Sequence, residues 1–600
     1  MSAIYGVVQF DDTALAPVTR ETLAPVAAAM AVWGPDGHGQ WCGVGAGLGH
    51  LMLHVTPESI YERLPAGIRV AQHLVITADA RIDNRDEIFG ALGVADSGRA
   101  QTPDSSLILL AYERWGPDCV KRLLGDFAFA IWDSRQRKLF CARDVFGCMP
   151  FVYCQDGKRF VFASDVKGVL ALVESPRLNE PLLAAYLQMN TYNAEKRYTF
   201  FEGIVKLLPA HTMTVTAEGV QTSRYWAPGD APEVRLASDA DYTERMRELF
   251  EQSVACRLRS AFPIGSHLSG GLDSTCVSIT ASRMMRGRGE ELSAYSWSPA
   301  PVPGAEFDPD SEHIRIEAVC QAEGLMCQYL PVTTENYFDL FRTDFTVNPT
   351  EMLAHESNVQ KRAVEQGVRV LLSGWGGDEA VSGRCRSAKR IDGRLRDAAI
   401  TRLPDYLYSL LVPTLWLEYK NPCIQPAFAA LHRRAVMNLR GPAFRPQPND
   451  RSTICHLLEY GHVTKRLEHW AISGARHRLV YRYPMLDRKL VEFILGVPAR
   501  QTVFRPAVAG ILPATVDWGR RKKESIGALA LKQVAFAACR EWADRPETDF
   551  AQVTATRFVD PDKILMAVRK KTSSGRLEQL GGVKEAFECY SIPDRCTTNK

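Results

Sequence analysis

The hexapeptide Ser269-Gly270-Gly271-Leu272-Asp273-Ser274 joins a predicted strand to a predicted helix, and this setting strongly restricts the fold. The apolar run over 261–268 predicts a buried strand, and helical spacing over 273–285 predicts the helix. The two glycines let a ligand approach the backbone closely, and the first amides of the helix carry a partial positive charge. The sequence therefore predicts an anion-binding loop at the end of a strand.

Strand and helix patterns continue to alternate after this loop. Strands are predicted at 292–297 and 368–372, and a helix at 311–323 that Gly324 ends. The chain beyond about residue 403 is more uniformly helical. This alternation indicates a doubly wound α/β domain with a parallel sheet, whose ligands bind beyond the carboxyl ends of the strands.

The predicted loop lacks the lysine of a Walker motif, which favours leaving pyrophosphate over a transferred γ-phosphoryl group as its ligand. Ser269 and Ser274 add two hydroxyl donors. The alternative is an ordinary glycine-rich turn with a Ser/Asp helix cap, which a bare Ser-Gly-Gly would favour. The complete hexapeptide between a strand and a helix favours the phosphate site.

A second glycine-rich loop, Ser373-Gly374-Trp375-Gly376-Gly377-Asp378-Glu379, directly follows the strand at 368–372. A carboxylate on this loop would meet Asp273 at the carboxyl edge of the sheet. Two carboxylates with pyrophosphate oxygens form a hard oxygen site that suits Mg²⁺. Without Asp273 nearby, a solvated helix cap would be the simpler interpretation of Asp378 and Glu379.

The first part of the chain has short apolar runs separated by turn-forming residues. Runs at 74–76, 127–132 and 160–163 predict strands, and a helical stretch at 106–115 interrupts them. This spacing predicts an α+β sandwich.

The segment 227–233 combines turn-forming and polar residues, which is typical of a linker. A helical pattern follows, with Ser238 or Asp239 as its cap. We therefore expect a first domain over 1–226, a linker over 227–237 and a second domain over 238–600.

Composition excludes several classes of function. The chain carries 72 Lys and Arg against 69 Asp and Glu, and this balance gives no electrostatic basis for binding nucleic acid or a membrane surface. No apolar run approaches the ~20 residues of a membrane helix, and the start of the chain lacks an export signal. The 15 cysteines form no CxxC pair, which indicates small buried side chains in a reducing compartment. We expect a cytoplasmic protein with no nucleic-acid or membrane partner.

The hexapeptide is the signature of the ATP-pyrophosphatase enzymes, and the chain resembles asparagine synthetases over nearly its whole length. The resemblance implies that ATP and Mg²⁺ bind, that a carboxylate becomes an acyl-adenylate, and that Asp273 and Asp378 hold the metal. It also implies an adenine site bordered by Leu268, Ser373 and Gly374, with Trp297 beside it. The implied phosphate-binding residues are Ser269, Gly270, Gly271, Asp273 and Ser274.

Two later stretches also carry the resemblance. The segment Tyr481–Asp487 resembles the R-x-P-F-L-D segment of asparagine synthetases, and we interpret it as packing under the site with Arg482 as a candidate phosphate ligand. Within Arg520–Glu524, the family places a catalytic lysine that stabilises charge on the acyl-adenylate, and the match falls on Lys523. A fixed cation at developing negative charge is effective in a dry site. In isolation, this basic run would be a solvated face or a weak nucleic-acid site.

Four stretches of the first domain, Gly34–Asp36, Gly125–Ala130, Arg143–Gly147 and Phe162–Ser164, resemble the glutaminase domain of asparagine synthetases, which is an Ntn-type fold. That family attacks glutamine with the thiolate of a cysteine exposed by removal of Met1. Ser2 stands at that position here, Met52 replaces the arginine that binds the substrate carboxylate, and Asp79 falls within the Ala-Asp-Ala-Arg that replaces the oxyanion Asn-Gly. Asp104 alone is retained. We expect a degenerate scaffold without glutaminase activity.

Without ammonia from glutamine, another nucleophile must resolve the adenylate, as in β-lactam synthetases and lasso-peptide macrolactam cyclases. Asparagine synthetases carry Glu three residues before the metal aspartate, and β-lactam synthetases carry a Tyr that belongs to a base dyad. Trp375 stands here, and its indole cannot take up a proton. The string Gly374–Glu379 resembles the lasso cyclases.

That resemblance implies that MgATP adenylates an Asp or Glu side chain of a leaderless core peptide. The peptide's own α-amine then forms the isopeptide bond of a macrolactam, and AMP and pyrophosphate are released. An amine with a pKa of ~8 is partly neutral at pH 7, so a dedicated base is not required. Aromatic residues over 406–419 are candidates for the peptide cavity or for a plain core helix. The resemblance implies a leader-binding element and a leader peptidase as partners.

Three alternatives remain at this stage. A β-lactam synthetase-like enzyme or an asparagine synthetase would act on a small amino acid. A pseudo-synthetase would only bind its ligands, and the pair Asp273 and Asp378 argues against it.

Overall fold

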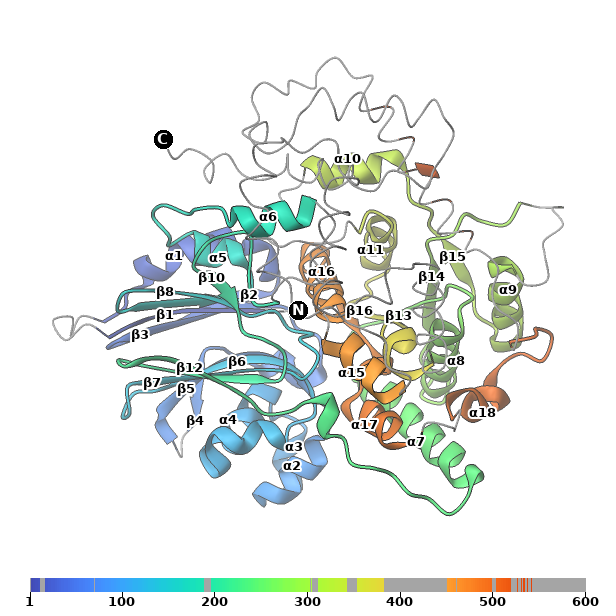
Figure 1. Ribbon diagram of the computed structural model, residues 1–600, viewed down its shortest axis with the longest axis horizontal. Coiled ribbons are helices and arrows are strands. Elements are labelled where there is room, and N and C mark those ends of the chain that lie inside the picture. The colour runs from blue at the N-terminus through green and yellow to red at the C-terminus, as the bar shows by residue number, and fades with distance from the viewer. Residues whose placement is uncertain are drawn as a thin grey trace, which may run out of the picture.

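The computed structural model places two antiparallel sheets beside a parallel sheet that helices flank (Figure 1). The described residues are 2–10, 17–68, 71–187, 196–302, 304, 311–342, 353–382, 450–459, 461–498, 503–518, 526, 530, 533–534, 537 and 541.

The first part of the chain is a sandwich of two six-stranded antiparallel sheets with helices, as predicted. One sheet has the order β10-β8-β9-β1-β3-β2 and the other β12-β11-β7-β6-β5-β4. The strands are β1 (Ala3–Gln9), β2 (Gly37–Gly43), β3 (Ala46–Met52), β4 (Ala66–Ile68), β5 (Ala71–Ile82), β6 (Gly125–Asp133), β7 (Lys138–Arg143), β8 (Val152–Asp156), β9 (Arg159–Ala163), β10 (Ile204–Lys206), β11 (His211–Thr216) and β12 (Gly219–Arg224).

Strand β6 explains why the sequence forms layers here. Its alternating side chains point to opposite faces of the sheet. Phe127, Phe129 and Ile131 belong to the core beneath the helices, whereas Ala128 and Trp132 belong to the larger core cluster, which includes residues of the other sheet. A strand that is apolar on both faces must lie inside a layered domain.

Helices cover the outer faces of the sandwich (Figure 1). The helix predicted at 106–115 is α4, which begins at Asp104 and packs on β5. The helices of this part are α1 (Arg20–Ala29), α2 (Arg85–Leu92), α3 (Asp96–Arg99), α4 (Asp104–Trp115), α5 (Val166–Leu170) and α6 (Glu180–Leu187).

The second part opens with α7 (Asp239–Arg257), whose cap is Ser238. The Ser238 hydroxyl accepts from the Asp241 amide at 3.2 Å, and the Asp241 carboxylate accepts from the Ser238 amide at 2.9 Å. This capping box fixes where the chain enters the second part. The preceding segment hydrogen-bonds to the end of a later helix, through Val234 N and Gly496 O. The boundaries predicted at 226 and 238 stay predictions.

A five-stranded parallel sheet of order β15-β14-β13-β16-β17 forms the core of the second part, which confirms the predicted doubly wound α/β class. Strands and helices alternate along the chain, and the helix predicted at 311–323 ends at Gly324 in the left-handed region. The elements are β13 (Ile264–His267), α8 (Leu272–Arg286), β14 (Leu292–Ser296), α9 (Glu312–Glu323), β15 (Cys327–Tyr329), α10 (Thr334–Arg342), α11 (Glu356–Glu365), β16 (Val370–Leu372), η6 (Gly377–Val381), α15 (Asp450–Glu459), α16 (His462–Arg476), β17 (Val480–Arg482), α17 (Arg488–Gly496) and α18 (Phe504–Val508).

The strand order reverses between β13 and β16. The chain adds β14 and β15 on one side of β13, and then β16 and β17 on the other. Ligands of doubly wound sheets bind at such a switch point, outside the carboxyl ends of the strands. The two glycine-rich loops follow these two strands, so the topology brings them to one place.

Buried ion pairs connect the two parts. Glu468 of α16 accepts from Arg143 Nη2 at 2.9 Å and from Lys206 Nζ at 2.6 Å. All three side chains are at most 5% exposed. Burial alone would raise the pKa of Glu468, but Lys206 and Arg143 hold it below its usual value. The parallel sheet is therefore fixed against the sandwich by charge as well as by packing.

Candidate functional site

The loop Ser269–Ser274 leaves β13 in a conformation that needs glycine. Gly270 has a φ of +64°, and a Cβ on this residue would lie 2.8 Å from the carbonyl oxygen of Glu312. Both the positive φ and the lack of room for a side chain beside Glu312 therefore favour glycine at this position. The loop leads directly into α8, so the first amides of a 15-residue helix face the switch point.

Two hydroxyls close this loop on itself. Ser269 Oγ and Ser274 Oγ lie 2.9 Å apart, and the Ser269 amide donates to Ser274 Oγ at 3.3 Å. The Gly271 amide donates to Ser269 Oγ at 3.4 Å. These bonds shape a cradle of amides and hydroxyls at a helix N-terminus, which suits an anionic phosphate group.

The second loop approaches the first at two glycines. A Cβ on Gly374 would lie 2.8 Å from the carbonyl carbon of Asp273, and a Cβ on Gly377 would lie 2.7 Å from Asp273 Oδ1. Any larger residue would force the two loops apart. The loop Ser373–Glu379 therefore reaches Asp273 because these two positions carry no side chain.

The acidic residues of the two loops influence one another electrostatically. Burial raises the pKa of Asp273 to about 7, with a further contribution from the charge of Asp378. Burial and the charge of Asp378 also raise the pKa of Glu379 to about 7. Like charges held together in this way are stabilised when a cation binds between them.

The donor set fits a divalent cation. Asp273 Oδ1 is buried and has no hydrogen-bonding partner among the described residues. A buried carboxylate oxygen without a partner is costly unless a ligand completes its coordination. Asp273 and Asp378 would hold Mg²⁺ together with oxygens of a bound polyphosphate.

The residues predicted around the adenine lie at the ends of neighbouring strands. Leu268 is fully buried, and its amide donates to the carbonyl of Tyr295 on β14 at 2.8 Å. The Ser373 amide donates to the carbonyl of Arg482 at 2.9 Å. Trp297 follows β14 directly and is half-buried. The structure thus gathers Leu268, Ser373 and Trp297 at the carboxyl edge of one sheet, and their contact with adenine stays a prediction.

Trp375 belongs to an aromatic group beside the second loop. Its ring meets Trp470 of α16 edge-on, with centroids 5.8 Å apart. The Arg466 guanidinium lies 5.3 Å from the centroid of Trp375 and 4.7 Å from that of Trp470. Trp470 also stacks on Tyr481 at 5.3 Å. An indole fixed between these groups cannot accept a proton.

Arg482 does not fit the role of a phosphate ligand. It lies in β17, an edge strand that the sequence did not predict, and is 2% exposed. Its Nη1 donates to the carbonyls of Arg257 at 2.6 Å and Arg259 at 2.9 Å. Arg482 therefore satisfies the carboxyl end of α7, and only the packing interpretation of this segment stands.

Two sequence predictions lie outside the described residues. These are the catalytic role of Lys523 within Arg520–Glu524 and the aromatic residues over 406–419. Both stay predictions.

Sequence reasoning missed two polar residues at this sheet edge. His267 ends β13 and Glu356 begins α11, and their Nε2 and Oε2 atoms lie 3.2 Å apart. The sequence signal that could have revealed this pair is His267 itself, because it is a histidine in a predicted buried strand, where apolar residues are the rule.

The residues at the glutaminase-like positions of the first part are paired or packed within the protein. Ser2 Oγ accepts from the Leu53 amide at 3.1 Å, and Met52 is packed in the core. Asp79 lies within β5, and burial raises its pKa to about 7. Asp104 accepts from Arg85 and, at 2.6 Å, from Arg259. A carboxylate in place of an oxyanion donor opposes the charge that amide hydrolysis develops.

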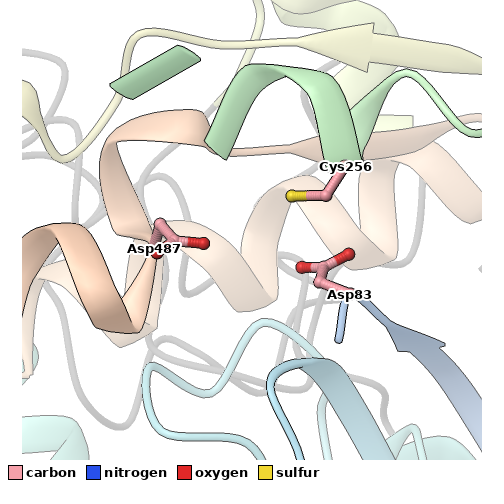
Figure 2. Close-up of side chains that lie close together, drawn as sticks. All are labelled: Asp83, Cys256 and Asp487. Carbon is pink, nitrogen blue, oxygen red and sulfur yellow. The ribbon is translucent and has the colours of Figure 1, made fainter. Parts of the chain in front are cut away.

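A separate acidic cluster between the two parts is structural. Figure 2 shows Asp83, Cys256 and Asp487, whose potential ligand atoms lie within 4.8 Å of one another. Asp83 pairs with Arg81 at 2.7 Å, and Asp487 pairs with Arg257 at 3.1 Å. Burial raises the pKa of the Cys256 thiol to about 12. Guanidiniums already supply the positive charge here, so the cluster is an ion-pair network rather than a metal site.

None of the described helices combines the length and the apolar character needed to cross a bilayer.

Comparisons with known proteins agree with both parts of the architecture. A family model for a glutamine amidotransferase domain matches residues 1–226, and a model for asparagine synthase matches residues 245–585. Asparagine synthetase 3 of Bacillus subtilis is 26% identical over 527 residues, which covers 84% of this chain and 83% of that protein. A putative asparagine synthetase of Methanocaldococcus jannaschii is 28% identical over 295 residues, covering 46% of this chain and 56% of that protein. A putative asparagine synthetase of Mycobacterium tuberculosis is 29% identical over 376 residues, covering 58% and 55%.

Proposed function

We propose that this chain, which belongs to the asparagine synthase family of ATP-dependent carbon–nitrogen ligases, closes the macrolactam ring of a lasso peptide. In this proposal, ATP adenylates an Asp or Glu side chain of a leaderless core peptide. The α-amine of the same peptide then displaces AMP and forms an isopeptide bond. A leader-binding element and a leader peptidase would supply the core peptide.

The two loops at the switch point account for the activation step. The amides and hydroxyls of Ser269–Ser274 would bind the phosphates, and Asp273 and Asp378 would hold Mg²⁺. The metal, when bound, neutralises the charge of the polyphosphate and of the leaving pyrophosphate. Lys523 would stabilise the acyl-adenylate, as the family resemblance implies.

The residues of the first domain argue that the nucleophile in the ligase reaction is not ammonia derived from glutamine. Ser2 replaces the thiol, Met52 cannot bind a carboxylate, and Asp79 opposes an oxyanion. Asp104 is neutralised by two guanidiniums of the protein. These features argue against a glutamine-dependent amidotransferase.

Trp375 is the single observation that carries the choice of substrate class. It stands where small-substrate members of the family place a Glu or a Tyr for proton transfer, and it is fixed against Trp470 and Arg466. An intramolecular amine that is positioned by a threaded peptide relies chiefly on orientation, and orientation alone can supply a large rate effect.

The test supplies MgATP and synthetic linear peptides with a free α-amine and a single Asp or Glu at successive positions. The expected result is AMP and pyrophosphate release together with a peptide product that has lost one molecule of water. L-Aspartate with ammonium and an N-carboxyethyl amino acid serve as the competing substrates. Turnover of either small substrate without any turnover of peptide would contradict the proposal.

Asparagine synthetase activity is the second candidate, because relatives that share 26–29% identity carry that name. It predicts asparagine formation from L-aspartate, ATP and ammonium. Formation of glutamate from glutamine would extend that candidate to the complete amidotransferase.

A further inference from the structure

A buried histidine ends the central strand of the parallel sheet. His267 is the last residue of β13 and immediately precedes Leu268 and the phosphate loop. The side chain is 2% exposed. Strands inside a parallel sheet are normally apolar on both faces, so a histidine at this position needs a specific reason.

The partner of His267 is Glu356 at the start of α11. His267 Nε2 lies 3.2 Å from Glu356 Oε2, and Glu356 is completely buried. The Tyr481 hydroxyl donates to the same carboxylate oxygen at 3.0 Å, and His355 Nε2 lies 3.5 Å from Oε1. The Tyr481 hydroxyl therefore holds the carboxylate by a hydrogen bond, and the two histidines lie within ion-pair distance of it.

The charge of Glu356 fixes the proton of His267 on one nitrogen. Burial alone would raise the pKa of Glu356, but His267, His355 and Arg466 lower it to about 2. A permanent carboxylate beside Nε2 keeps the proton there and leaves the lone pair on Nδ1. Within the described part of the chain, neither ring nitrogen of His267 makes a hydrogen bond, and Glu356 acts on Nε2 through the ion-pair contact at 3.2 Å. The pair thus has the arrangement of a carboxylate-oriented base.

The surroundings connect this pair to the candidate site. The His267 ring contacts Trp297 at a centroid distance of 5.2 Å and Trp470 at 6.2 Å. Trp470 in turn contacts Trp375 on the second loop. His267 therefore lies between the predicted adenine side of the site and the loop that carries Asp378.

We propose that His267, oriented by Glu356, accepts the proton that the attacking amine loses when it displaces AMP. The amine nitrogen forms a bond to the acyl carbon, and the carbon–oxygen bond to AMP breaks with its electron pair on the phosphate oxygen. The proton on nitrogen moves to His267 Nδ1. This inference rests on the proposed function for the acyl-adenylate and replaces the expectation that no dedicated base is required.

The test separates adenylation from amide formation in His267→Gln. The carboxylate probes are the linear peptides and L-aspartate named above, and ATP–pyrophosphate exchange reports adenylation. Hydroxylamine traps the adenylate as an uncharged nucleophile that needs no base. We expect unchanged exchange and unchanged hydroxamate formation, with amide formation by the α-amine or by ammonium lowered about a hundredfold or more. His50→Gln is the matched control, because His50 is equally buried at 1% in the first domain.

A second variant makes the test independent of how the glutamine side chain introduced in His267→Gln packs. In His267→Ala, added imidazole should restore amide formation, which a merely structural histidine would not permit. Loss of exchange in both variants, or amide formation at the wild-type rate, would overturn the inference while leaving the proposed function intact. Absence of exchange in the wild-type protein with every carboxylate would instead overturn the proposed function and this inference with it.

Discussion

Arg259, just after α7, donates a hydrogen bond from Nη2 to Oδ2 of Asp104 in the first domain, at 2.6 Å. The same guanidinium donates to Glu58 at 2.7 Å, and Arg85 donates to the other oxygen of Asp104. The one acid that the glutaminase resemblance retains is therefore neutralised from both sides. It joins the two parts of the chain and is not free to bind a cationic group of a substrate.

Restoring the lost nucleophile should not restore glutaminase activity. We expect Ser2→Cys to release no more glutamate from glutamine than the wild type. Asp104 stays paired with Arg259, and Met52 cannot bind the carboxylate of glutamine. Asp79 also places a carboxylate where negative charge would develop during hydrolysis. An enzymatic glutamate assay, with an active glutamine amidotransferase as the positive control, makes the comparison. Clear glutamate release by this variant would contradict a degenerate site.

The contact between the two loops predicts a severe effect from one methyl group. In Gly377→Ala, the new Cβ would lie 2.7 Å from Asp273 Oδ1 and displace the carboxylate that we propose to bind the metal. We expect ATP–pyrophosphate exchange to fall by at least about tenfold, which corresponds to about 1.4 kcal/mol in the barrier. Gly90→Ala is the control, because a Cβ there meets nothing within 4 Å. Equal activity of the two variants would show that the loops do not need this close approach.

The acidic pair should be essential for activation of the carboxylate. Asp273→Asn keeps the shape of the side chain but removes a charge that a bound divalent cation would compensate. Because metal and phosphate stabilisation is worth several kcal/mol, we expect exchange to fall by about a hundredfold or more. Asp118→Asn, at an exposed carboxylate that is 72% accessible, should have no effect. Retained exchange in Asp273→Asn would remove Asp273 from the site.

Lys523→Ala tests a residue that was assigned by resemblance alone. We expect ring formation to be lost, because the lysine would stabilise charge on the adenylate and during its breakdown. Lys522→Ala changes the adjacent lysine and should retain activity. Product formation is followed by mass spectrometry, and a loss that is equal in both variants would indicate a general effect of the basic run.

The parts of the fold that sequence predicts are local. The hexapeptide Ser269–Ser274 specifies its own strand–loop–helix setting, because Gly270 needs a positive φ and the helix begins directly behind it. The cap at Ser238 and the end at Gly324 follow from short-range hydrogen bonds in the same way.

The relationships that sequence does not predict join distant residues. Glu356 meets His267 across 89 positions of the chain, and Arg259 meets Asp104 across 155. Strand β17 has only three residues and lies at the edge of the sheet, so no periodicity marks it. The sequence predicts the packing role of the segment around Arg482, but leaves Arg482 a candidate phosphate ligand because nothing in the segment reveals that the end of α7 lies beside it. Such contacts depend on the topology of the whole sheet rather than on any local pattern.

Glu468→Gln tests the buried ion pairs between the two parts. The change leaves Arg143 and Lys206 buried without a carboxylate, so we expect a loss of about 3–5 kcal/mol in the free energy of unfolding at neutral pH. Glu459→Gln is the control, because its pair with Arg224 is about half-exposed and worth at most about 1 kcal/mol. Urea unfolding of both variants measures the difference.

The same residue predicts how stability depends on pH. The pKa of Glu468 is lower in the folded protein than in the unfolded chain, so the folded state binds this proton less tightly. The stabilisation is therefore fully present above the unfolded pKa of about 4.3 and is lost as the pH falls through the folded value. In Glu468→Gln, this portion of the acid-induced loss should be absent, and the unfolding free energies of variant and wild type should converge as the pH falls below the lowered pKa that Glu468 has in the folded protein. A constant difference between the two proteins from pH 7 to pH 3 would mean that the charge of Glu468 contributes nothing to the interface.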